Sequence, residues 1–297
     1  RFDFWSYMKI SVFGTGYVGL VTGICFAEMG NEVTCADIDA GKIEKLKKGE
    51  SPIYEPGLDD LILGNIQSDR VIFTTEIKSA IEKSDVLFIA VGTPSDDDGS
   101  ADMKYVYAVA KDIATHMNGP KTIVTKSTVP IGTYQQVKKI ITTELEKLNK
   151  NYTFDLVSNP EFLREGCAIE DAFNPNRVVV GLESDAAADL MKRLYAPFLK
   201  NGSPLLVMDP ASAEMTKYAA NATLAAKISL MNEFSQLCEA TGADIESVRS
   251  GIGSDHRIGP HFIYAGVGYG GSCFPKDIRA LIYMGKSMGK DMRILEQ

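Results

Sequence analysis

The stretch Lys9–Met29, KISVFGTGYVGLVTGICFAEM, decides the fold of this 297-residue chain. Lys9–Phe13 has the apolar character of a strand, and Leu20–Met29 that of a buried helix. Of the three glycines between them, the first permits a tight turn, the second lets the backbone approach a phosphate, and the third allows close packing of helix on strand. We expect a dinucleotide pyrophosphate at the amino end of the helix, against Gly14, Gly16, Tyr17, Val18 and Gly19.

A carboxylate follows the next predicted strand, Glu32–Ala36. Asp37 stands where an acid accepts hydrogen bonds from the adenosine ribose of a dinucleotide. Its charge favours NAD, because it repels the additional phosphate of NADP. Lys42 is a second candidate for cofactor binding, although a cation here would also suit NADP. A glycine turn in an unrelated α/β protein is the alternative interpretation.

Short apolar runs alternate with helical patterns along the rest of the chain, which favours a doubly wound α/β fold with a parallel, Rossmann-like sheet. The further predicted strands are Val71–Thr74, Val86–Val91, Thr122–Lys126, Leu156–Ser158, Arg177–Val180 and Leu205–Met208, and the predicted helices include Met103–Met117, Thr133–Leu148 and Asp185–Phe198. A long helix from Pro210 to about Thr241 then leads into a small helical unit. We expect an NAD-binding domain over 8–208 and a helical catalytic and dimerisation region over 209–297. Residues 1–7 precede a natural-looking start at Met8 and are interpreted as an artificial leader.

Composition narrows the class of partner. Thirty-one basic and 39 acidic residues give a net charge of −8, which disfavours binding to nucleic acid or to an anionic membrane surface. No apolar run approaches the ~20 residues of a membrane span. Five cysteines without regular spacing indicate reduced thiols, and the three histidines do not cluster with them, so we expect no metal site. The sequence predicts a cytoplasmic protein that acts on a small molecule.

Hydroxyl groups follow two of the predicted strands. Thr93 comes after Val86–Val91, and Thr128 comes after Thr122–Lys126. Open α/β sheets bind ligands beyond the carboxyl ends of their strands, so both hydroxyls are candidates to face the cofactor. Each threonine could instead cap the helix that follows it.

Two carboxylates lie four residues apart in NPEFLREG, residues 159–166. On a helical turn Glu161 and Glu165 share one face, where crowding raises the pKa of one of them and suits it to proton transfer. The alternative is a solvated helix start with acids near its positive end.

The long helix carries a polar pair one turn apart. Lys217 and Asn221 continue into the apolar stripe of Leu224 and Ile228, which predicts that the pair is at least partly buried. A buried lysine has to face an anion or a developing negative charge. An ion pair with Glu214 is the alternative.

The strongest signal is GYGGSCFPKD, residues 268–277. Cys273 lies just before a predicted helix in which Pro275 suits the first turn, and the helix end and nearby Lys276 both favour the reactive thiolate. We expect the other cysteines, Cys25, Cys35, Cys167 and Cys238, to be small buried hydrophobes. A thiolate combined with NAD is typical of aldehyde oxidation through a thiohemiacetal, whose loss of hydride gives a thioester that water hydrolyses.

Together these motifs resemble the nucleotide-sugar dehydrogenases of the UDP-glucose/GDP-mannose dehydrogenase family, which oxidise a sugar 6-alcohol to the acid with two NAD. From Met8 onward the chain contains GTGYVG, SPIYEPGL, VGTP, STVP, NPEFLREG, AEMTKYAANA and GYGGSCFPKD in order. Asp255–Gly259 and Phe262–Tyr264 look most like members that act on UDP-glucose. Members that act on GDP-mannose or UDP-N-acetyl-mannosamine share the thiol motif but usually differ here.

The resemblance implies a catalytic role for each matched residue. Cys273 is the implied nucleophile, and Lys217 and Asn221 are implied to stabilise an oxyanion at carbon 6. Asp277 is implied to assist proton transfer and hydrolysis. Thr128 and Glu161 are implied to hold the water and to share in acid/base steps, and whether Glu161 or Asp277 is the principal base stays open.

The resemblance also implies binding residues and partners. Glu165 and Lys276 are implied to lie near the cofactor, and Gly266–Gly271 is implied to wrap the sugar and diphosphate. Arg257 is implied to reach the sugar across a homodimer interface built on the long helix. The implied substrate-binding residues are Glu161, Phe162, Leu163, Lys217, Asn221, Arg257, Phe262, Tyr264, Gly268 and Gly270.

Relatives of this kind continue into a further α/β domain that binds the uridine nucleotide, so we expect this chain to bind NAD but to turn over poorly. Two other functions stay open. One is an NAD-binding regulatory module without catalysis. The other is a 3-hydroxyacid-type dehydrogenase, which uses a lysine on the long helix and does not require Cys273.

Overall fold

The computed structural model describes residues 7–199 and 201–296, so the first six residues of the expected leader lie outside its described part. The chain divides into two compact units. Unit 1 comprises Arg1–Thr93 and Met103–Met215, and unit 2 comprises Pro94–Asp102 and Thr216–Gln297.

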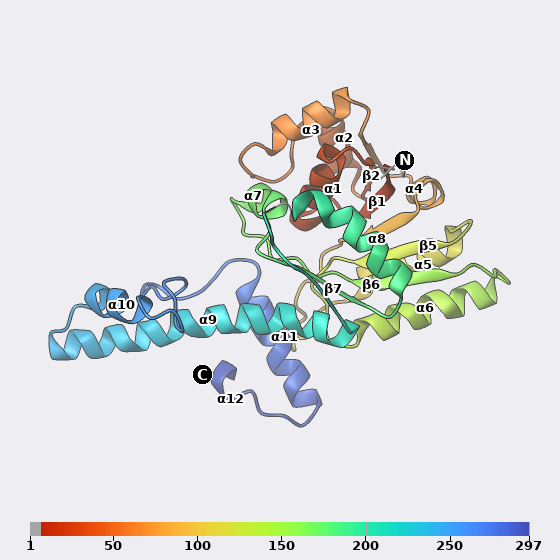
Figure 1. Ribbon diagram of the computed structural model, residues 1–297. Helices are drawn as coiled ribbons and strands as arrows, with labels where there is room; N and C mark the ends of the chain where they lie inside the picture. Colours follow the sequence, from red (N-terminus) through yellow and green to blue (C-terminus); the bar gives the residue numbers. More distant parts are fainter. Residues whose placement is uncertain (1–6, 200, 297) are drawn as a thin grey trace. The chain divides into compact units, whose positions relative to one another are not determined.

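Unit 1 is built on an eight-stranded sheet with the order β3-β2-β1-β4-β5-β6-β7-β8 (Figure 1). The strands are β1 (Lys9–Phe13), β2 (Glu32–Ala36), β3 (Val71–Thr74), β4 (Val86–Ile89), β5 (Lys121–Thr125), β6 (Phe154–Ser158), β7 (Val178–Leu182) and β8 (Leu205–Met208). The first six follow the doubly wound order, in which successive strands are added on one side of β1 up to β3 and on the other side from β4 onward. In such sheets the ligand crevice lies outside the carboxyl ends of β1 and β4. The predicted fold class is confirmed.

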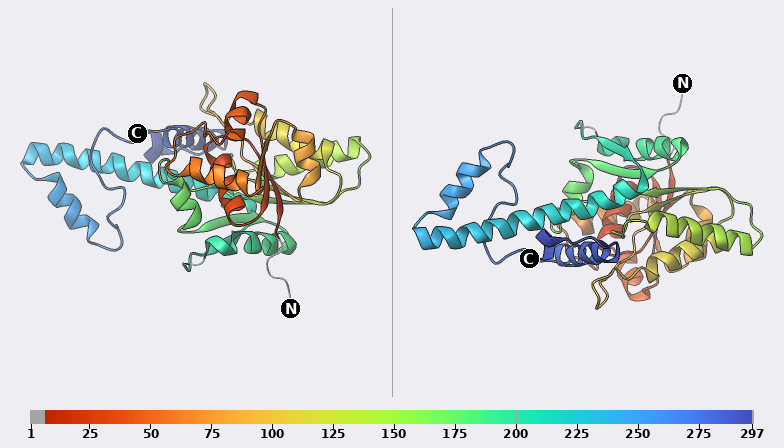
Figure 2. Two further views of the ribbon diagram at one scale, coloured as in Figure 1. Left: turned by 90° about the horizontal axis from the view of Figure 1, so that it is seen from above. Right: turned by 90° about the horizontal axis from the view of Figure 1, so that it is seen from below.

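Helices pack on both faces of this sheet (Figure 2). They are α1 (Tyr17–Glu28), α2 (Ala40–Lys47), α3 (Leu58–Gln67), α4 (Ile77–Lys83), α5 (Lys104–His116), α6 (Thr133–Lys147), α7 (Ala168–Phe173) and α8 (Asp185–Tyr195), with a 3-10 turn at Ala196–Phe198. Because both faces are covered, every residue of β4 and β5 is buried, and β4 (VLFI) is apolar throughout.

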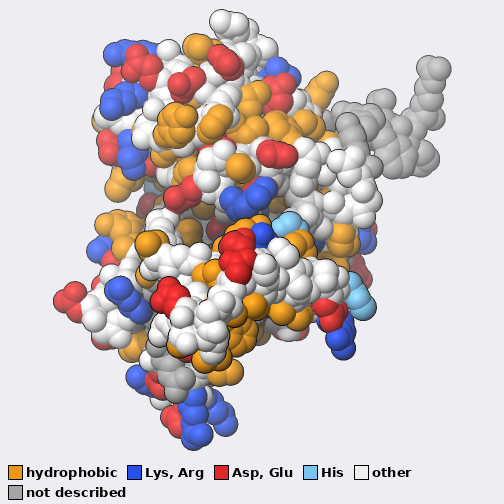
Figure 3. Space-filling model, turned by 90° about the vertical axis from the view of Figure 1, so that its left-hand side faces the viewer, with side chains coloured by type: hydrophobic (Ala, Val, Ile, Leu, Met, Phe, Trp, Pro, Cys, Tyr) orange, Lys and Arg blue, Asp and Glu red, His pale blue; other side chains and the backbone are white. Residues whose placement is uncertain are grey.

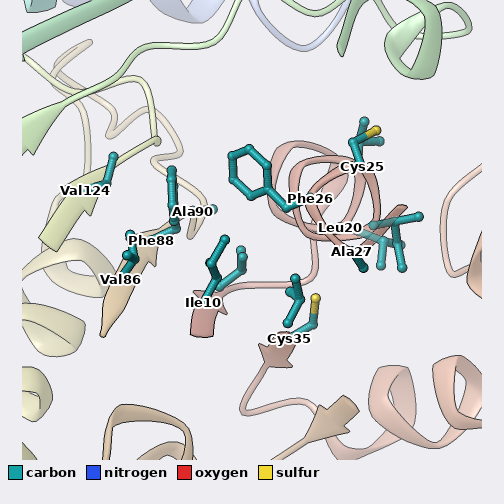
Figure 4. Packing of buried hydrophobic residues seen from close by; sticks show 14 of the residues in the cluster. Ile10, Leu20, Cys25, Phe26, Ala27, Cys35, Val86, Phe88, Ala90 and Val124 are labelled. Atoms are coloured by element: carbon teal, nitrogen blue, oxygen red, sulfur yellow. The ribbon is translucent and has the colours of Figure 1, made fainter. Parts of the chain in front are cut away.

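An apolar core lies between α1 and the sheet (Figure 4). The Phe26 ring of α1 lies 5.1 Å from that of Phe88 in β4, and its other ring neighbours are Tyr195 and Phe198. Burying a side chain of this size contributes about 1.5–3 kcal/mol. This packing fixes the amino end of α1 at the end of β1.

One strand pair departs from the parallel arrangement. β6 and β7 are antiparallel, with Val157 opposite Leu182, whereas every other neighbouring pair is parallel. An antiparallel neighbour needs no helical crossover, so the connection between them stays at one end of the sheet. That connection contains residues 159–167 and the short α7. It therefore places NPEFLREG at the ligand-binding edge.

Unit 2 is mainly helical. Most of the 32-residue α9 (Pro210–Thr241) belongs to it, which confirms the predicted long helix, and α10 (Ile245–Gly253), α11 (Phe274–Ser287) and α12 (Arg293–Glu296) follow. The unit also contains Pro94–Asp102, which folds back on itself through a bridge between Ser95 and Ala101. Among the helices of the described residues, none combines the length and the apolar character needed to cross a bilayer.

Candidate active site

The glycine turn lies where the carboxyl ends of β1 and β4 meet. Gly14 has φ of 100°, a conformation that favours glycine, and its N–H donates to the carbonyl of Ala36 at 2.8 Å. A Cβ at Gly14 would lie 2.6 Å from the backbone oxygen of Ala90, beside the end of β4. The turn therefore runs directly against the crevice between the two halves of the sheet.

The amino end of α1 has the properties of a phosphate site. Its N-cap residue, Gly16, has no side chain with which to cap the N–H groups of the first turn. A Cβ at Gly16 would meet nothing within 4 Å, whereas one at Gly19 would lie 2.0 Å from the oxygen of Gly14. The space in front of Gly16 and the positive end of the helix dipole together fit the pyrophosphate of NAD.

Asp37, at the end of β2, is tied to this turn. Its Oδ2 accepts hydrogen bonds from the Thr15 N–H at 2.7 Å and the Thr15 hydroxyl at 2.8 Å, and its Oδ1 accepts one from the Asp39 N–H at 3.0 Å. Partial burial acts to raise the pKa of Asp37, but these hydrogen bonds and the charge of Lys42 outweigh it, so the pKa is lowered. These hydrogen bonds thus favour the charged carboxylate and hold it beside the glycine turn.

Asp37→Asn should destabilise unit 1 by about 1–2 kcal/mol at neutral pH, because the amide cannot satisfy all three donors. The lowered pKa means that this contribution is present above the ordinary value of 3.8 and is lost as the pH falls through the folded-state pKa. Urea unfolding of both proteins at neutral pH and below pH 3.8 measures the difference. A gap that persists unchanged in acid contradicts the prediction.

The two predicted threonines join neighbouring loops. The Thr93 hydroxyl donates to the Thr128 carbonyl at 2.8 Å. The N-cap residues of the helices that follow them are Met103 and Gly132, so the interpretation of these threonines as helix caps is wrong. The loops after β4 and β5 are therefore held together at the crevice.

Glu214 anchors the loop after β5 to the first turn of α9. Its buried carboxylate accepts hydrogen bonds from the N–H groups of Gly132 and Tyr134, at 2.6 and 2.7 Å, and from the Ser158 hydroxyl. Burial raises the pKa of Glu214 although these donors oppose the shift. The start of α9 and the start of α6 therefore share one buried acid.

Glu161 and Glu165 do not share a helical turn, so the helical interpretation of NPEFLREG is wrong. Residues 159–164 have no regular secondary structure, a turn follows, and α7 begins only at Ala168. The buried Glu161 carboxylate bends back to accept from the Leu163 N–H at 2.6 Å, while Glu165 is exposed. The hydrogen bond from the Leu163 N–H to the Glu161 side chain replaces a helical backbone hydrogen bond here, although the two glutamates have helical spacing.

Arg177 lies beside this loop and was not predicted from the sequence as a site residue. Its guanidinium is 3.7 Å from the ring centre of Phe162, a cation–π contact. Burial lowers the pKa of Arg177, and the charges of Glu161 and Asp171 oppose that shift. A strand-start arginine has no sequence signal that reveals an aromatic partner in the preceding loop.

In unit 2 the predicted polar pair on α9 is buried, with 4% of Lys217 and 6% of Asn221 exposed. The Asn221 amide donates to Oδ2 of Asp277 at 2.6 Å, and the Lys276 ammonium donates to Oδ1 of Asp277 at 2.6 Å. Asp277 is itself buried. Asn221 and Asp277, both predicted to act on the substrate, thus share one polar cluster with Lys276, which was predicted to lie near the cofactor. Lys217 lies one turn before Asn221 on the same face of α9.

Cys273 is exposed and is the N-cap residue of α11, with Pro275 in the first turn, as predicted. Its carbonyl accepts the Asp277 N–H at 2.9 Å, and its Sγ lies 3.5 Å from the Ser272 hydroxyl. The nucleophile candidate therefore stands one helical turn before the buried polar cluster. All five cysteines are free, but the prediction that Cys167 is buried is wrong, because it lies in the exposed loop before α7.

The predicted substrate loop packs next to Cys273. The rings of Phe262 and Tyr269 contact that of Phe274, with centroid separations of 6.2 and 6.4 Å. Phe262 has φ of 62°, which is uncommon for a bulky residue and marks a tightly held turn. Gly268, with φ of 108°, and Gly270 continue the loop toward Cys273.

Two further substrate candidates are more exposed. Arg257 pairs with Asp255 at 2.5 Å, and Arg249 lies over the Tyr264 ring at 4.6 Å. Among the described residues no group of three or more histidines, cysteines and acids is arranged to hold a metal ion. The candidate residues thus form two sets, with the cofactor turn, Thr128 and Glu161 in unit 1, and Lys217, Asn221, Cys273 and Asp277 in unit 2.

Comparison with known proteins gives matches along almost the whole chain. Residues 8–199 match the NAD binding domain of the UDP-glucose/GDP-mannose dehydrogenase family, and residues 211–297 match its central domain. The chain is 53% identical over 289 residues to UDP-glucose 6-dehydrogenase TuaD of Bacillus subtilis, covering 97% of this chain and 61% of that protein. It is 50% identical over 288 residues to UDP-glucose 6-dehydrogenase of Pseudomonas aeruginosa, covering 97% of this chain and 64% of that protein.

A solved UDP-glucose dehydrogenase from the archaeon Pyrobaculum islandicum shares the fold, with a TM-score of 0.92 and 40% identity over 98% of this chain and 67% of that one. The chain thus spans somewhat less than two thirds of the two curated relatives. The match to the NAD binding domain includes the glycine turn and Asp37, the residues whose geometry fits NAD. The chain belongs to the UDP-glucose/GDP-mannose dehydrogenase family.

Proposed function

We propose that this chain is the NAD-binding and catalytic part of a UDP-glucose 6-dehydrogenase, which oxidises UDP-glucose to UDP-glucuronate. The observation that carries the proposal is the exposed thiol of Cys273 one turn before a buried polar cluster. Both curated relatives described above are named UDP-glucose 6-dehydrogenase, which supports UDP-glucose over other nucleotide sugars.

The Gly14–Gly19 turn and Asp37 would hold NAD, which would supply the hydride acceptor for both oxidation steps. The chain's own residues handle the rest of the reaction. The Lys217 ammonium and the Asn221 amide stabilise negative charge on the oxygen at carbon 6, and Asp277 carries protons to and from the same region. Glu161 and Thr128 of unit 1 are proposed to position the water and to share in proton transfer.

The thiol accounts for the second oxidation. The sulfur of Cys273 forms a bond to the aldehyde carbon while the carbonyl oxygen takes a proton, which gives a thiohemiacetal. Loss of a hydride from that carbon and of the proton from its hydroxyl group gives a thioester. Water then adds, the carbon–sulfur bond breaks, and the acid leaves with the thiol restored.

We also propose that the protein is a homodimer that pairs through α9. Leu230, Phe234 and Leu237 are exposed and spaced three and four residues apart, so they share one face of the helix. Hydrophobic side chains reach the surface among charged ones on the face seen in Figure 3.

The five free cysteines support a reducing compartment, such as the cytoplasm.

The decisive experiment follows NADH formation with UDP-glucose, GDP-mannose and UDP-N-acetyl-mannosamine. Because the curated relatives are longer, the assay uses this chain alone and joined to the remaining carboxyl-terminal part of TuaD. The proposal is supported if only UDP-glucose gives NADH, with two NADH for each sugar. If another nucleotide sugar gives NADH instead, that sugar is the substrate. NAD binding without NADH from any sugar, combined with a Cys273 that resists alkylation in the native protein, favours a non-catalytic NAD-binding module.

A further inference from the structure

Glu55 is a buried acid to which the catalytic proposal gives no role. It belongs to the connection between α2 and α3, within the SPIYEPGL motif, and is only 7% exposed. A buried carboxylate is tolerated only where hydrogen-bond donors surround it. Its donors therefore indicate what it holds in place.

The carboxylate of Glu55 receives donors from two distant segments. One oxygen accepts from the Tyr17 hydroxyl and from the Gly166 N–H at 2.9 Å, and the other accepts from the Ala168 N–H at 2.7 Å and the Ile169 N–H at 3.4 Å. Tyr17 is the first residue of α1, in the dinucleotide turn. Gly166 lies at the end of the loop that carries Glu161 and Glu165.

The Tyr17 hydroxyl bonds both Glu55 and Gly166. Its hydroxyl donates to Glu55 and accepts from the Gly166 N–H at 2.7 Å. Burial, followed by the hydrogen bond to Glu55, raises the pKa of Tyr17, so the phenol keeps its proton and remains a donor. Glu55, Tyr17 and Gly166 thus form a closed triangle of hydrogen bonds.

A simple helix cap does not require this triangle. The N–H groups of Ala168 and Ile169 occupy one oxygen of Glu55, which is sufficient to cap the six-residue α7. The second oxygen serves Tyr17 and Gly166. Since residues 159–167 have no helix or strand to fix them, their conformation depends on side-chain contacts. This contact holds the end of the segment, together with the pairing of Arg164 with Asp171.

We propose that Glu55 is a positioning residue that holds the dinucleotide turn and the Glu161–Cys167 loop in one fixed arrangement. Through Tyr17 it sets the start of α1, where the pyrophosphate of NAD binds. Through Gly166 it sets the loop that approaches the same crevice. The inference concerns NAD binding and does not require dehydrogenase activity.

The test is a double-mutant cycle on NAD affinity, measured by calorimetry on the whole chain. Tyr17→Phe removes the hydroxyl and leaves the α7 cap in place, and Glu55→Gln keeps the side-chain shape but replaces one acceptor oxygen by a donor. Each should weaken NAD binding about tenfold, roughly the value of a hydrogen bond to a charged group. The double variant should lose about the same tenfold, since both changes break one linkage.

Glu50→Gln is the matched control, because Glu50 lies in the same connection and is exposed. It should leave NAD affinity unchanged. Lower thermal stability with unchanged NAD affinity in both Tyr17→Phe and Glu55→Gln would show that Glu55 is a helix cap alone. Losses that multiply in the double variant would show independent contributions and would also overturn the linkage. If Glu55→Gln fails to fold, an unchanged affinity in Tyr17→Phe is sufficient to reject the proposal.

Discussion

Cys273→Ser should slow the second oxidation, from aldehyde to acid, by roughly a thousandfold or more, since the proposed nucleophile is replaced by a far weaker one. Serine is close in size to cysteine and is a favourable N-cap residue, so α11 should begin as before. The loss would therefore reflect chemistry and not folding. The number of NADH formed for each UDP-glucose, two with the thiol and at most one without it, measures the effect, with circular dichroism as the check on folding.

The chain offers a closely matched control in Cys167. It too is exposed and is the N-cap residue of a helix, α7. Cys167→Ser should keep full activity and should still lose its activity when Cys273 is alkylated. If Cys273→Ser forms as much NADH for each sugar as the unchanged chain, the covalent mechanism is wrong, and a 3-hydroxyacid-type dehydrogenase, which needs only the lysine on α9, becomes the better assignment.

Gly19→Ala should weaken NAD binding by roughly a hundredfold or more and should destabilise unit 1 by about 1–3 kcal/mol, the usual range for overpacking. The added Cβ would lie 2.0 Å from the backbone oxygen of Gly14 and 3.1 Å from Cβ of Ala90. A backbone oxygen cannot rotate away as a side chain can. Either α1 or the turn has to move, and the phosphate site is lost. Calorimetric titration with NAD and thermal unfolding measure the two effects.

Two other glycines separate the effects of folding and binding. Gly16→Ala has open space around the added methyl group, so it should keep the fold and lose NAD affinity alone. Gly64→Ala, inside α3, also meets no atom within 4 Å and should raise stability by about 1 kcal/mol without any change in NAD affinity. Normal NAD affinity in Gly19→Ala would falsify the assignment of this turn as the pyrophosphate site.

Much of the fold could be predicted because it depends on local patterns. Buried strands such as Glu32–Ala36 are short apolar runs between turn residues, and α9 is a long run of helix-forming residues without an internal proline or glycine. The direction of β7 could not be predicted, because its apolar run is the same in a parallel and an antiparallel neighbour. Strand direction depends on where the preceding connection crosses the sheet.

The candidate site was predictable to a similar extent. The spacing of Lys217 and Asn221 fixed their shared face, and the residues around Cys273 fixed its place before α11. The exposure of Cys167 and the bent-back Glu161 were missed, since both depend on hydrogen bonds within an irregular loop. No role for Glu55 could be predicted from the SPIYEPGL motif, because its hydrogen-bond partners lie 38 and more than 100 residues away in the sequence.

The short segment Pro94–Asp102 has a consequence for how such chains can be recombined. It lies within the sequence of the nucleotide-binding unit but belongs to the helical one, where a Cβ at Gly99 would touch Arg279. No single cut in the polypeptide can separate the two units cleanly. If two homologous genes recombined within α9, the nine residues of this segment would come from one parent and the helices of the same unit from the other. The helical unit would then be a mixture of both parents, although the sequence shows no boundary at this segment.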